Sequence, residues 1–173
     1  QDSVRILCFA SCVAMCSTQP EAQCAEFVHP AIDAFGKDAS WRVRLEVAKA
    51  LEDLVEAIPG GLPVEMCCNM LKDPELDVRR FALEKVAVVC RGDADSAESS
   101  GILAALADLA DVDIEVPNAH LMKTSLAKQS LALANIVGRE ATQAHLIPIL
   151  VKLIQVRTHL HHLLTSFLFS TAC

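Results

Sequence analysis

The pair Val-Arg occurs at residues 4–5, 43–44, 78–79 and 156–157, and its first three copies are separated by 39 and then by 35 residues in a chain of 173 residues. Asp38 and Asp73 stand at the same position before the second and third copies, each six residues ahead of the arginine. A unit of this length holds two helices and the turns that join them. The sequence therefore predicts a chain built from repeated helical hairpins, which constrains its fold before any other feature is considered.

A repeat of about 35 to 45 residues is typical of HEAT and armadillo proteins, whose hairpins stack into a solenoid. The composition agrees, because hydrophobic residues make up 53% of the chain and one tryptophan and no tyrosine are present, as suits closely stacked helices. The predicted fold class is all-α, a HEAT-repeat alpha solenoid of stacked antiparallel helix hairpins. Residues 1–173 are predicted to form a single array, because no polar stretch is longer than a solenoid turn. Its predicted units are the second helix of a repeat over 1–18, repeats over 19–58, 59–93 and 94–138, and a partial, divergent repeat over 139–173.

Helical periodicity and end signals predict helices over residues 4–17, 20–36, 41–58, 63–72, 74–91, 102–109, 121–137 and 141–154. Ser3, Ser40 and Asp73 are the predicted N-caps, and Pro30 predicts a kink in the second helix. Residues 92–100 are predicted to form a loop between repeats, and residues 111–118 the longest turn within a repeat. The predicted apolar face of the first helix contains Val4, Leu7, Cys8, Ser11, Cys12 and Met15, and that of the second contains Cys24, Phe27, Val28, Ile32 and Phe35.

Aspartate, valine and arginine recur together in the turns that lead into the second helices. An aspartate at a helix start can accept backbone N–H groups, and an arginine further on can hydrogen bond to the aspartate of the adjacent repeat. We interpret these residues as structural, since they hold repeats in register. The predicted ladder consists of Asp38, Arg44, Asp73 and Arg79, with Val43 and Val78 filling the seam between stacked units.

Trp41 and Arg42 stand inside the same turn, but the ladder does not require them. They fall on the ridge of turns that a solenoid presents along one edge. Tryptophan and arginine are also enriched in binding hot spots. We therefore interpret Trp41 and Arg42 as exposed partner-binding residues, the alternative being that Trp41 packs against the neighbouring turn.

The chain has eight cysteines, many of them in apolar helical stretches where thiols behave as small buried hydrophobes. No apolar leader of the signal type is present, and the chain begins at Gln1, which indicates a piece of a longer protein. We therefore expect reduced thiols and an intracellular protein, cytoplasmic or nuclear. The cysteines that support this interpretation are Cys8, Cys12, Cys16, Cys67, Cys68 and Cys90.

No metal, cofactor or catalytic site is predicted. His159, His161 and His162 lie close together in sequence, but their spacing does not align them on one helix face, and no carboxylate or thiol partner is near. The stripe of cysteines at 8, 12 and 16 lacks a fourth ligand. The phosphate-binding glycine motifs, the nucleophile elbow and the zinc-protease motif are all missing from the sequence.

Charge and hydropathy argue against two further classes of protein, those that bind nucleic acids and those that span a membrane. The formal net charge is −7 and the fifteen basic residues are scattered, which argues against a nucleic-acid-binding surface. No apolar run reaches the roughly eighteen residues of a membrane-spanning helix, since the closest, 163–173, is short and contains serine and threonine. We expect a soluble protein that binds other proteins.

The turn at residues 38–44 and the Leu-Glu-Val-Ala that follows it resemble a turn and second helix of the scaffold (A) subunits of protein phosphatase 2A. Similar segments follow in the same order at residues 1–7, 70–73, 77–79 and 145–148, so the resemblance covers residues 1–154. The Trp-Arg-Val-Arg sequence is its most specific element. In that family HEAT repeats form a horseshoe-shaped scaffold, and the resemblance places this chain near the middle of the array.

The resemblance implies a scaffold without catalytic activity or cofactor, whose turns bind regulatory B-type subunits of the phosphatase. The resemblance makes Trp41 and Arg42 the best candidates for the contact with a regulatory subunit, followed by Leu76 and Asp77. The catalytic subunit would bind repeats outside this chain. Departures from the family pattern are the short spacing from Val43 to Val78, a proline at 117 where the ladder aspartate belongs, and the divergent sequence after residue 154.

Two other interpretations stay open. One is another HEAT adaptor, such as a transport receptor that binds extended peptides along its concave face, although the basic or asparagine-rich inner ladder that would favour it is missing. The other is a HEAT-like enzyme of the bilin lyase kind, which a reactive cysteine of low pKa would favour.

Overall fold

The computed structural model describes residues 1–58, 62–91, 101–113 and 117–155, and these residues contain helices and no strand. The prediction of an all-α fold is confirmed for this part of the chain. The helices are α1 (Asp2–Cys16), α2 (Glu21–Gln23), α3 (His29–Gly36), α4 (Trp41–Lys49), α5 (Leu51–Ala57), α6 (Leu62–Leu71), α7 (Leu76–Cys90), α9 (Ile102–Ala110) and α10 (Ala119–Ala141), with π-helical turns η1 (Cys24–Val28) and η2 (Thr142–Leu146). Residues 147–155 continue in helical conformation.

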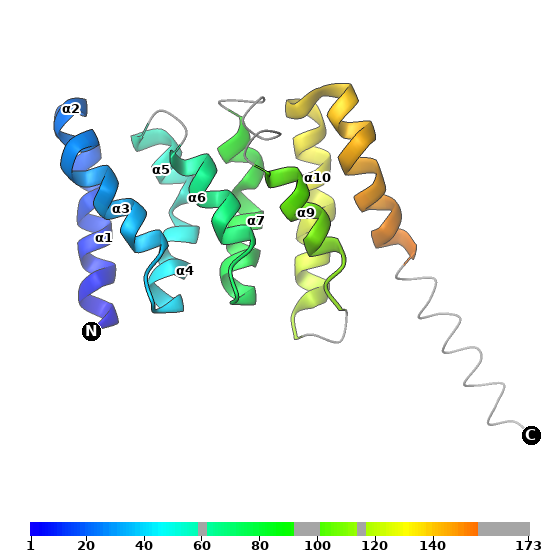
Figure 1. The fold of residues 1–173 in the computed structure, drawn as a ribbon, viewed down its shortest axis with the longest axis horizontal. Helices are drawn as coiled ribbons and strands as arrows, with labels where there is room; N and C mark the ends of the chain where they lie inside the picture. The colour runs from blue at the N-terminus through cyan, green and yellow to red at the C-terminus, as the bar shows by residue number, and fades with distance from the viewer. Residues whose placement is uncertain (59–61, 92–100, 114–116, 156–173) are drawn as a thin grey trace, which may run out of the picture.

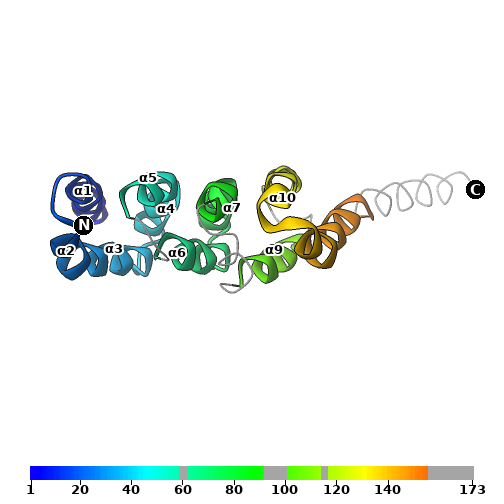
Figure 2. The same ribbon diagram turned by 90° about the horizontal axis from the view of Figure 1, so that it is seen from above.

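The helices form two layers, seen end-on in Figure 2. One layer holds α1, the α4–α5 pair, α7 and α10, and the other holds α2 and α3, α6, α9 and residues 147–155. Figure 1 shows that the elements of each layer follow one another along the long axis of the molecule. The contacts follow the same order, since α7 packs against α4, α5, α6 and α10, while α1 packs against α3, α4, α5 and η1.

The core lies between the two layers and is densest in the middle of the row. Met70 and Leu71 of α6 and Leu83 of α7 are at most 1% exposed. At the first end, α1 buries only Phe9, whose ring meets that of Phe35 edge to face with centroids 5.7 Å apart. Each fully buried side chain of this size stabilises the fold by roughly 1.5–3 kcal/mol, so most of the stabilisation comes from the middle.

Both π-helical turns lie directly before a proline. Val28 ends η1 just ahead of Pro30 in the first turn of α3, and Leu146 ends η2 just ahead of Pro148. A proline lacks an N–H group and its ring collides with the carbonyl four residues earlier, a clash that a wider π turn relieves. The kink predicted at Pro30 is therefore a wide turn that divides residues 21–36 into α2, η1 and α3.

The single helix predicted over residues 41–58 is wrong, because Ala50 separates α4 from α5. Its backbone has φ −87° and ψ 3°, and its N–H is shared between the carbonyl oxygens of Glu46 and Val47, each 3.1 Å away. Neither glycine nor proline stands at this break. The local sequence therefore carries no signal for it.

The predicted N-caps also need correction. Ser3 lies inside α1, which begins one residue earlier. Ser40 occupies the N-cap position of α4, but its hydroxyl donates to Oδ2 of Asp2 at 2.8 Å instead of accepting a backbone N–H. Asp73 precedes the N-cap of α7, which is Glu75, because Oδ1 of Asp73 accepts the N–H of Glu75 at 2.9 Å and closes a turn before the helix.

The apolar faces predicted for the first two helices are partly wrong. Val4, Leu7 and Met15 of α1 are 56, 69 and 48% exposed, and Phe27 of η1 is 67% exposed. Periodicity identifies residues that share a face, but it does not say which face a neighbour covers. The loop predicted over 92–100, residues 114–116 of the long turn, and residues 156–173 with their three histidines lie outside the described residues.

Candidate partner-binding surface

Arg44 of α4 and Asp73 in the turn before α7 form a two-pronged ion pair between successive helix pairs. Nε and Nη2 of Arg44 donate to Oδ2 and Oδ1 of Asp73 at 2.6 and 2.9 Å. The two side chains are only 12 and 6% exposed. This hydrogen bonding holds the pKa of Arg44 above its ordinary value. Nη1 of Arg44 also donates to the carbonyl of Asp38 at 2.8 Å, which joins both turns.

A related ion pair occurs one helix pair earlier, between Arg5 of α1 and Asp38, but it has a single hydrogen bond and the Arg5 side chain is 40% exposed. Nη2 of Arg5 donates to Oδ1 of Asp38 at 3.1 Å, whereas its Nε lies 2.8 Å from Oδ2 without forming a hydrogen bond. Oδ1 of Asp38 also accepts the N–H of Ser40 at 2.7 Å, as Asp73 does for Glu75. Each aspartate therefore closes its own turn and receives an arginine from the preceding pair.

The third arginine of the predicted ladder, Arg79, makes no such pair among the described residues. Arg79 holds the position in α7 that Arg44 holds in α4, yet its Nε is buried and makes no hydrogen bond among the described residues. Part of the turn opposite, residues 114–116, is outside those residues. Val43 and Val78, predicted to fill the seam, are both 0% exposed.

Trp41 and Arg42 begin α4 at the end of the first such turn. Trp41 is half-buried and Arg42 is exposed, and the guanidinium carbon of Arg42 lies 5.0 Å from the centre of the Trp41 ring. Nη1 of Arg42 is 4.0 Å from Oδ2 of Asp2. The pair therefore presents a cation stacked on an aromatic ring, with part of each side chain accessible to a partner.

Leu76 and Asp77 begin α7 in the equivalent place, and both are half-buried. The structure adds residues that sequence reasoning missed. Nε of Arg80 lies 3.8 Å from Oδ1 of Asp77, and its guanidinium carbon lies 4.2 Å above the ring of Phe81. Nζ of Lys49 lies 5.4 Å from the same ring. The sequence did hold a signal for Arg80. It is the second of two successive arginines, and only the first, Arg79, belongs to the predicted ladder.

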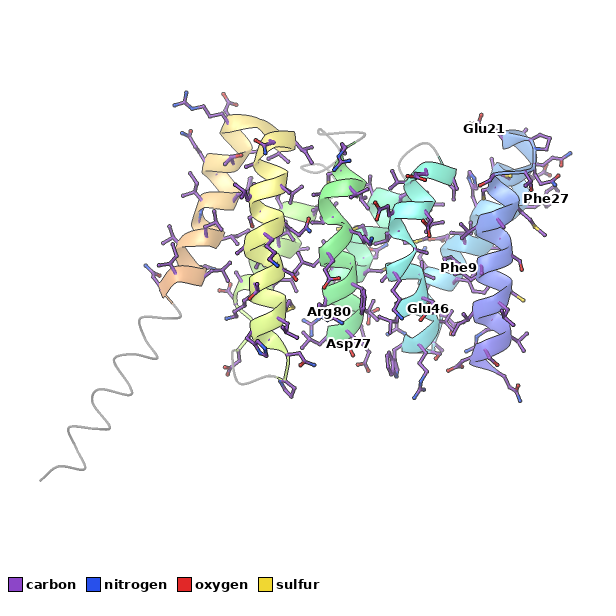
Figure 3. The ribbon with its side chains drawn as sticks, turned by 180° about the vertical axis from the view of Figure 1, so that it is seen from behind. Phe9, Glu21, Phe27, Glu46, Asp77 and Arg80 are labelled. Atoms are coloured by element: carbon purple, nitrogen blue, oxygen red, sulfur yellow. The ribbon has the colours of Figure 1, made fainter. Side chains whose placement is uncertain are left out.

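These two helix starts lie along one edge of the molecule. Figure 1 shows α4 and α7 beginning at the same edge, and Figure 3 shows Asp77 and Arg80 near that edge on α7. We call Trp41, Arg42, Leu76 and Asp77 the turn edge. The Arg–Asp pairs fix its spacing, because each pair ties one turn to the next.

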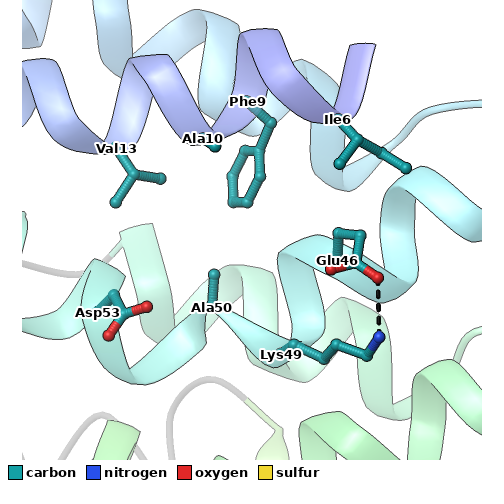
Figure 4. A pocket seen from close by; sticks show the side chains of 8 residues that line it. All are labelled: Ile6, Phe9, Ala10, Val13, Glu46, Lys49, Ala50 and Asp53. Atoms are coloured by element: carbon teal, nitrogen blue, oxygen red, sulfur yellow. Dashed lines mark hydrogen bonds and ion pairs between the residues drawn. The ribbon is translucent and has the colours of Figure 1, made fainter. Parts of the chain in front are cut away.

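A groove of about 350 Å³ lies between α1 and the α4–α5 pair, shown in Figure 4. Its α1 wall is apolar, and its opposite wall carries the ion pair between Lys49 and Glu46, 2.7 Å apart. The groove can take an apolar side chain flanked by polar groups. The lining residues are Ile6, Phe9, Ala10, Val13, Glu46, Lys49, Ala50 and Asp53.

The cysteines divide into exposed and buried groups. Cys8 is exposed, which corrects the expectation that the whole cysteine stripe of α1 packs in the core, and Cys12 is half-buried. Cys67 is 0% exposed, and burial raises its pKa well above the ordinary value. Such a thiol is a poor nucleophile at neutral pH. Within the described ranges, no group of histidine, cysteine and carboxylate side chains is placed to hold a metal ion.

No family model matches the chain, and no curated protein matches it in sequence. In the described part of the chain, no helix is long and apolar enough to cross a lipid bilayer.

Proposed function

We propose that this chain is part of a HEAT-repeat solenoid that scaffolds a protein complex, and that the complex is a serine/threonine phosphatase of the 2A type. The turn edge would bind regulatory B-type subunits, and the catalytic subunit would bind repeats outside this chain. The chain itself would carry no catalytic activity and would need no cofactor.

The observation that carries this proposal is the repeated Arg–Asp pair. Arg5 with Asp38 and Arg44 with Asp73 connect successive helix pairs at equivalent positions. An arrangement that repeats its connections positions equivalent turns at regular intervals, which is how solenoid proteins build extended binding surfaces. The resemblance of the Trp-Arg-Val-Arg turn to phosphatase scaffold subunits supplies the kind of partner.

The mechanism of such a scaffold is proximity. Two subunits held on one frame meet at an effective concentration set by the frame rather than by their bulk concentration. At the turn edge, Trp41 and Arg42 would act as the anchor, because tryptophan and arginine are enriched in binding hot spots and an indole ring buries a large area with few rotatable bonds. The stacking of Arg42 on Trp41 holds both in place before binding.

The test is a pull-down of purified B-type regulatory subunits and of the catalytic subunit by the full chain. The variant Trp41→Ala with Arg42→Glu should lose the regulatory subunit. The matched control is Arg91→Glu, which makes the same charge change at an exposed residue after the end of α7. Equal helicity of all three proteins by circular dichroism is the requirement for the comparison.

Capture of a regulatory subunit by wild type and by Arg91→Glu, but not by the double variant, would support both the function and the site. Capture by all three would support the function and reject the turn edge. A helical wild type that captures no regulatory subunit would reject the phosphatase proposal.

The groove between α1 and α4–α5 favours a second candidate, a HEAT-type adaptor that holds an apolar side chain of a peptide partner. Ala10 lies in the apolar wall of the groove and is exposed. The variant Ala10→Trp would fill the groove without touching the turn edge. Loss of a partner in this variant alone would favour the adaptor over the phosphatase scaffold.

A further inference from the structure

The groove between α1 and the α4–α5 pair lies between helices that pack against each other. Its middle is hollow because the two side chains that face each other there, Ala10 and Ala50, are small (Figure 4). The polar contacts of α1 with the following helix pair involve Asp2 and Arg5 and are confined to residues 38–42. Among the described residues, no hydrogen bond or ion pair therefore crosses the groove.

The later gaps of the same layer are closed by long side chains. Lys85 of α7 forms an ion pair with Glu52 of α5 across the next gap. Across the gap after that, Nε2 of Gln129 in α10 donates to the carbonyl of Glu84 in α7 at 3.0 Å. The first gap differs from both, because it keeps a volume of about 350 Å³ that a side chain of another molecule can enter.

The charges of the groove are not balanced along its length. At one end, Glu46 and Lys49 neutralise each other through their ion pair. At the other end, Asp53 is exposed and makes no ion pair with any described residue. Figure 4 shows Asp53 opposite Val13, whereas the ion pair lies opposite Ile6. An unpaired carboxylate therefore borders the apolar hollow at one end only.

Asp53 also has a structural role to consider. It lies in the first turn of α5 beside Glu52, where a carboxylate interacts favourably with the helix dipole. That role needs a negative charge near the helix start, but it does not require the charge to lie at the groove. The two roles differ in what they predict for a ligand, because only a binding role makes the charge of the ligand matter.

We propose that the groove binds a short extended segment of a partner protein, with an apolar side chain in the hollow between Ala10 and Ala50 and a lysine or arginine beside Asp53. Charge complementarity selects this occupant, because the unpaired charge of the groove is negative and the formal net charge of the whole chain is −7. The aliphatic stem of the basic residue would pack on Val13. A segment with an acidic residue at that place would meet repulsion.

The distance between the two parts of the groove defines the segment. Ala50 and Asp53 are three residues apart, which is close to one helical turn with its rise of about 5 Å. Alternate residues of an extended peptide point to the same side and are about 6.6 Å apart. The segment therefore needs an apolar and a basic residue separated by one other residue, in either order. This inference rests on the adaptor candidate and is independent of the phosphatase proposal.

Titration of the full chain with short peptides, followed by NMR of its methyl groups, tests the proposal. The probes are the capped peptides Gly-Leu-Ser-Arg-Gly and Gly-Arg-Ser-Leu-Gly at millimolar concentration, and their counterparts with glutamate in place of arginine. At least one arginine peptide should shift the methyl signals of Ala10 and Val13. Its glutamate counterpart should bind at least about threefold more weakly, and molar salt should reduce this difference, since it screens the charges.

Substitutions identify the residue that sets the preference. Asp53→Asn should abolish the preference for arginine, and Asp53→Lys should reverse it in favour of glutamate. The matched control is Glu56→Lys, which makes the same charge change at an exposed residue of α5 outside the groove and should bind like the wild type. Ala10→Trp should bind neither peptide, because it fills the hollow. Circular dichroism should show equal helicity in all of these proteins.

Three results would overturn the proposal. One is equal binding of the arginine and glutamate peptides by the wild type, which would reject the basic residue and leave the apolar adaptor candidate intact. Another is an unchanged preference for arginine in Asp53→Lys. The third is that no peptide shifts the signals of Ala10 and Val13, including the case in which these signals move only as the protein is concentrated, because the occupant would then be a second copy. The variant Trp41→Ala with Arg42→Glu should bind the peptides like the wild type, which keeps this test separate from that of the turn edge.

Discussion

At the scale of single residues, the pair of Arg44 and Asp73 is the contact whose loss should cost most. The side chains are 12 and 6% exposed, so removing one leaves a nearly buried charge without its partner. Breaking a buried pair in this way typically costs about 3 kcal/mol. We expect Arg44→Ala to lower the free energy of unfolding by about that amount, measured by urea denaturation followed by circular dichroism.

Lys37→Ala is the control for this prediction. Lys37 and Asp33 are also an ion pair, 2.7 Å apart, but their side chains are 60 and 37% exposed. Solvent screens such a pair, so its loss should leave the denaturation midpoint unchanged within error. Equal losses in Arg44→Ala and Lys37→Ala would contradict the structural role given to the buried pair.

The cysteines should react with a thiol reagent in an order set by burial. Cys8 is exposed, Cys12 is half-buried and Cys67 is fully buried. Burial raises the pKa of Cys12 and raises that of Cys67 well above its ordinary value. Mass spectrometry after brief alkylation at pH 8 should therefore find label on Cys8 first and on Cys67 only after denaturant is added. Early labelling of Cys67 would revive the enzyme interpretation.

The raised pKa of Cys67 also fixes the sign of a pH effect. The folded protein holds this thiol neutral, whereas the unfolded chain ionises it at the ordinary pKa. The stabilisation that the neutral, buried thiol gives the folded protein is fully present below the ordinary pKa. It is lost as the pH rises through the higher pKa of the folded state. Stability should therefore fall in alkaline solution, and Cys67→Ala should reduce that fall when denaturation midpoints are compared across pH.

Residue-level prediction from sequence works where chemistry and spacing agree. Arg44 and Asp73 carry opposite charges at a repeated offset, so their pairing can be expected from the sequence alone. The contacts of Arg80 and Lys49 with Phe81 cannot, because they depend on how α4 and α7 approach each other. The groove beside Phe9 depends in the same way on the packing of α1 against α4 and α5.

At the scale of elements, Gly138 has a conformation that other residues adopt only under strain. It interrupts α10 with φ 80° and ψ −178°, a region that is almost confined to glycine. A methyl group at this position would meet no atom within 4 Å, so backbone strain alone decides the outcome. We expect Gly138→Ala to destabilise the protein by about 1–2 kcal/mol in urea denaturation.

Gly36→Ala is the matched substitution. Gly36 ends α3 without a positive φ, and the nearest atom to an added methyl group is the flexible end of Met66 at 3.4 Å. The unfolded chain loses freedom in this variant, so its stability should stay within about 1 kcal/mol of the wild type. A larger loss of stability in Gly36→Ala than in Gly138→Ala would show that contacts of the added methyl group, rather than backbone strain, determine the cost of the substitution.

Sequence predicted the helices but not their irregularities. Apolar periodicity was sufficient to predict α10, and the glycine at 138 was sufficient to predict its break, because glycine tolerates a conformation that other residues adopt only under strain. The π turns before Pro30 and Pro148 are local in cause, yet proline is equally compatible with a simple kink. The break at Ala50 has no local cause, since alanine favours helix and nothing but its packing environment distinguishes it.

At the scale of the whole molecule, burial is unequal along the row. The helices α1 and α7 are both 15 residues long, but α1 buries one residue and α7 buries seven. The sequence of α1 is the more apolar of the two, with two charged residues against five in α7. Composition would therefore predict the opposite difference. The observed difference follows from position, because α7 has neighbours on both sides of its layer, α4 and α5 before it and α10 after it.

This inequality predicts the order of local unfolding. A helix covered on one side can open without breaking the rest of the row, whereas opening α7 separates its neighbours. Hydrogen exchange should therefore find the amides of α1 exchanging at least about tenfold faster than those of α7. Ala82→Gly within α7 should raise exchange in both halves of the row, whereas Ala14→Gly in α1 should raise it only in α1 and η1. Uniform exchange rates along the chain would mean that the helices unfold as one cooperative unit, and the prediction that α1 opens independently of α7 would then be wrong.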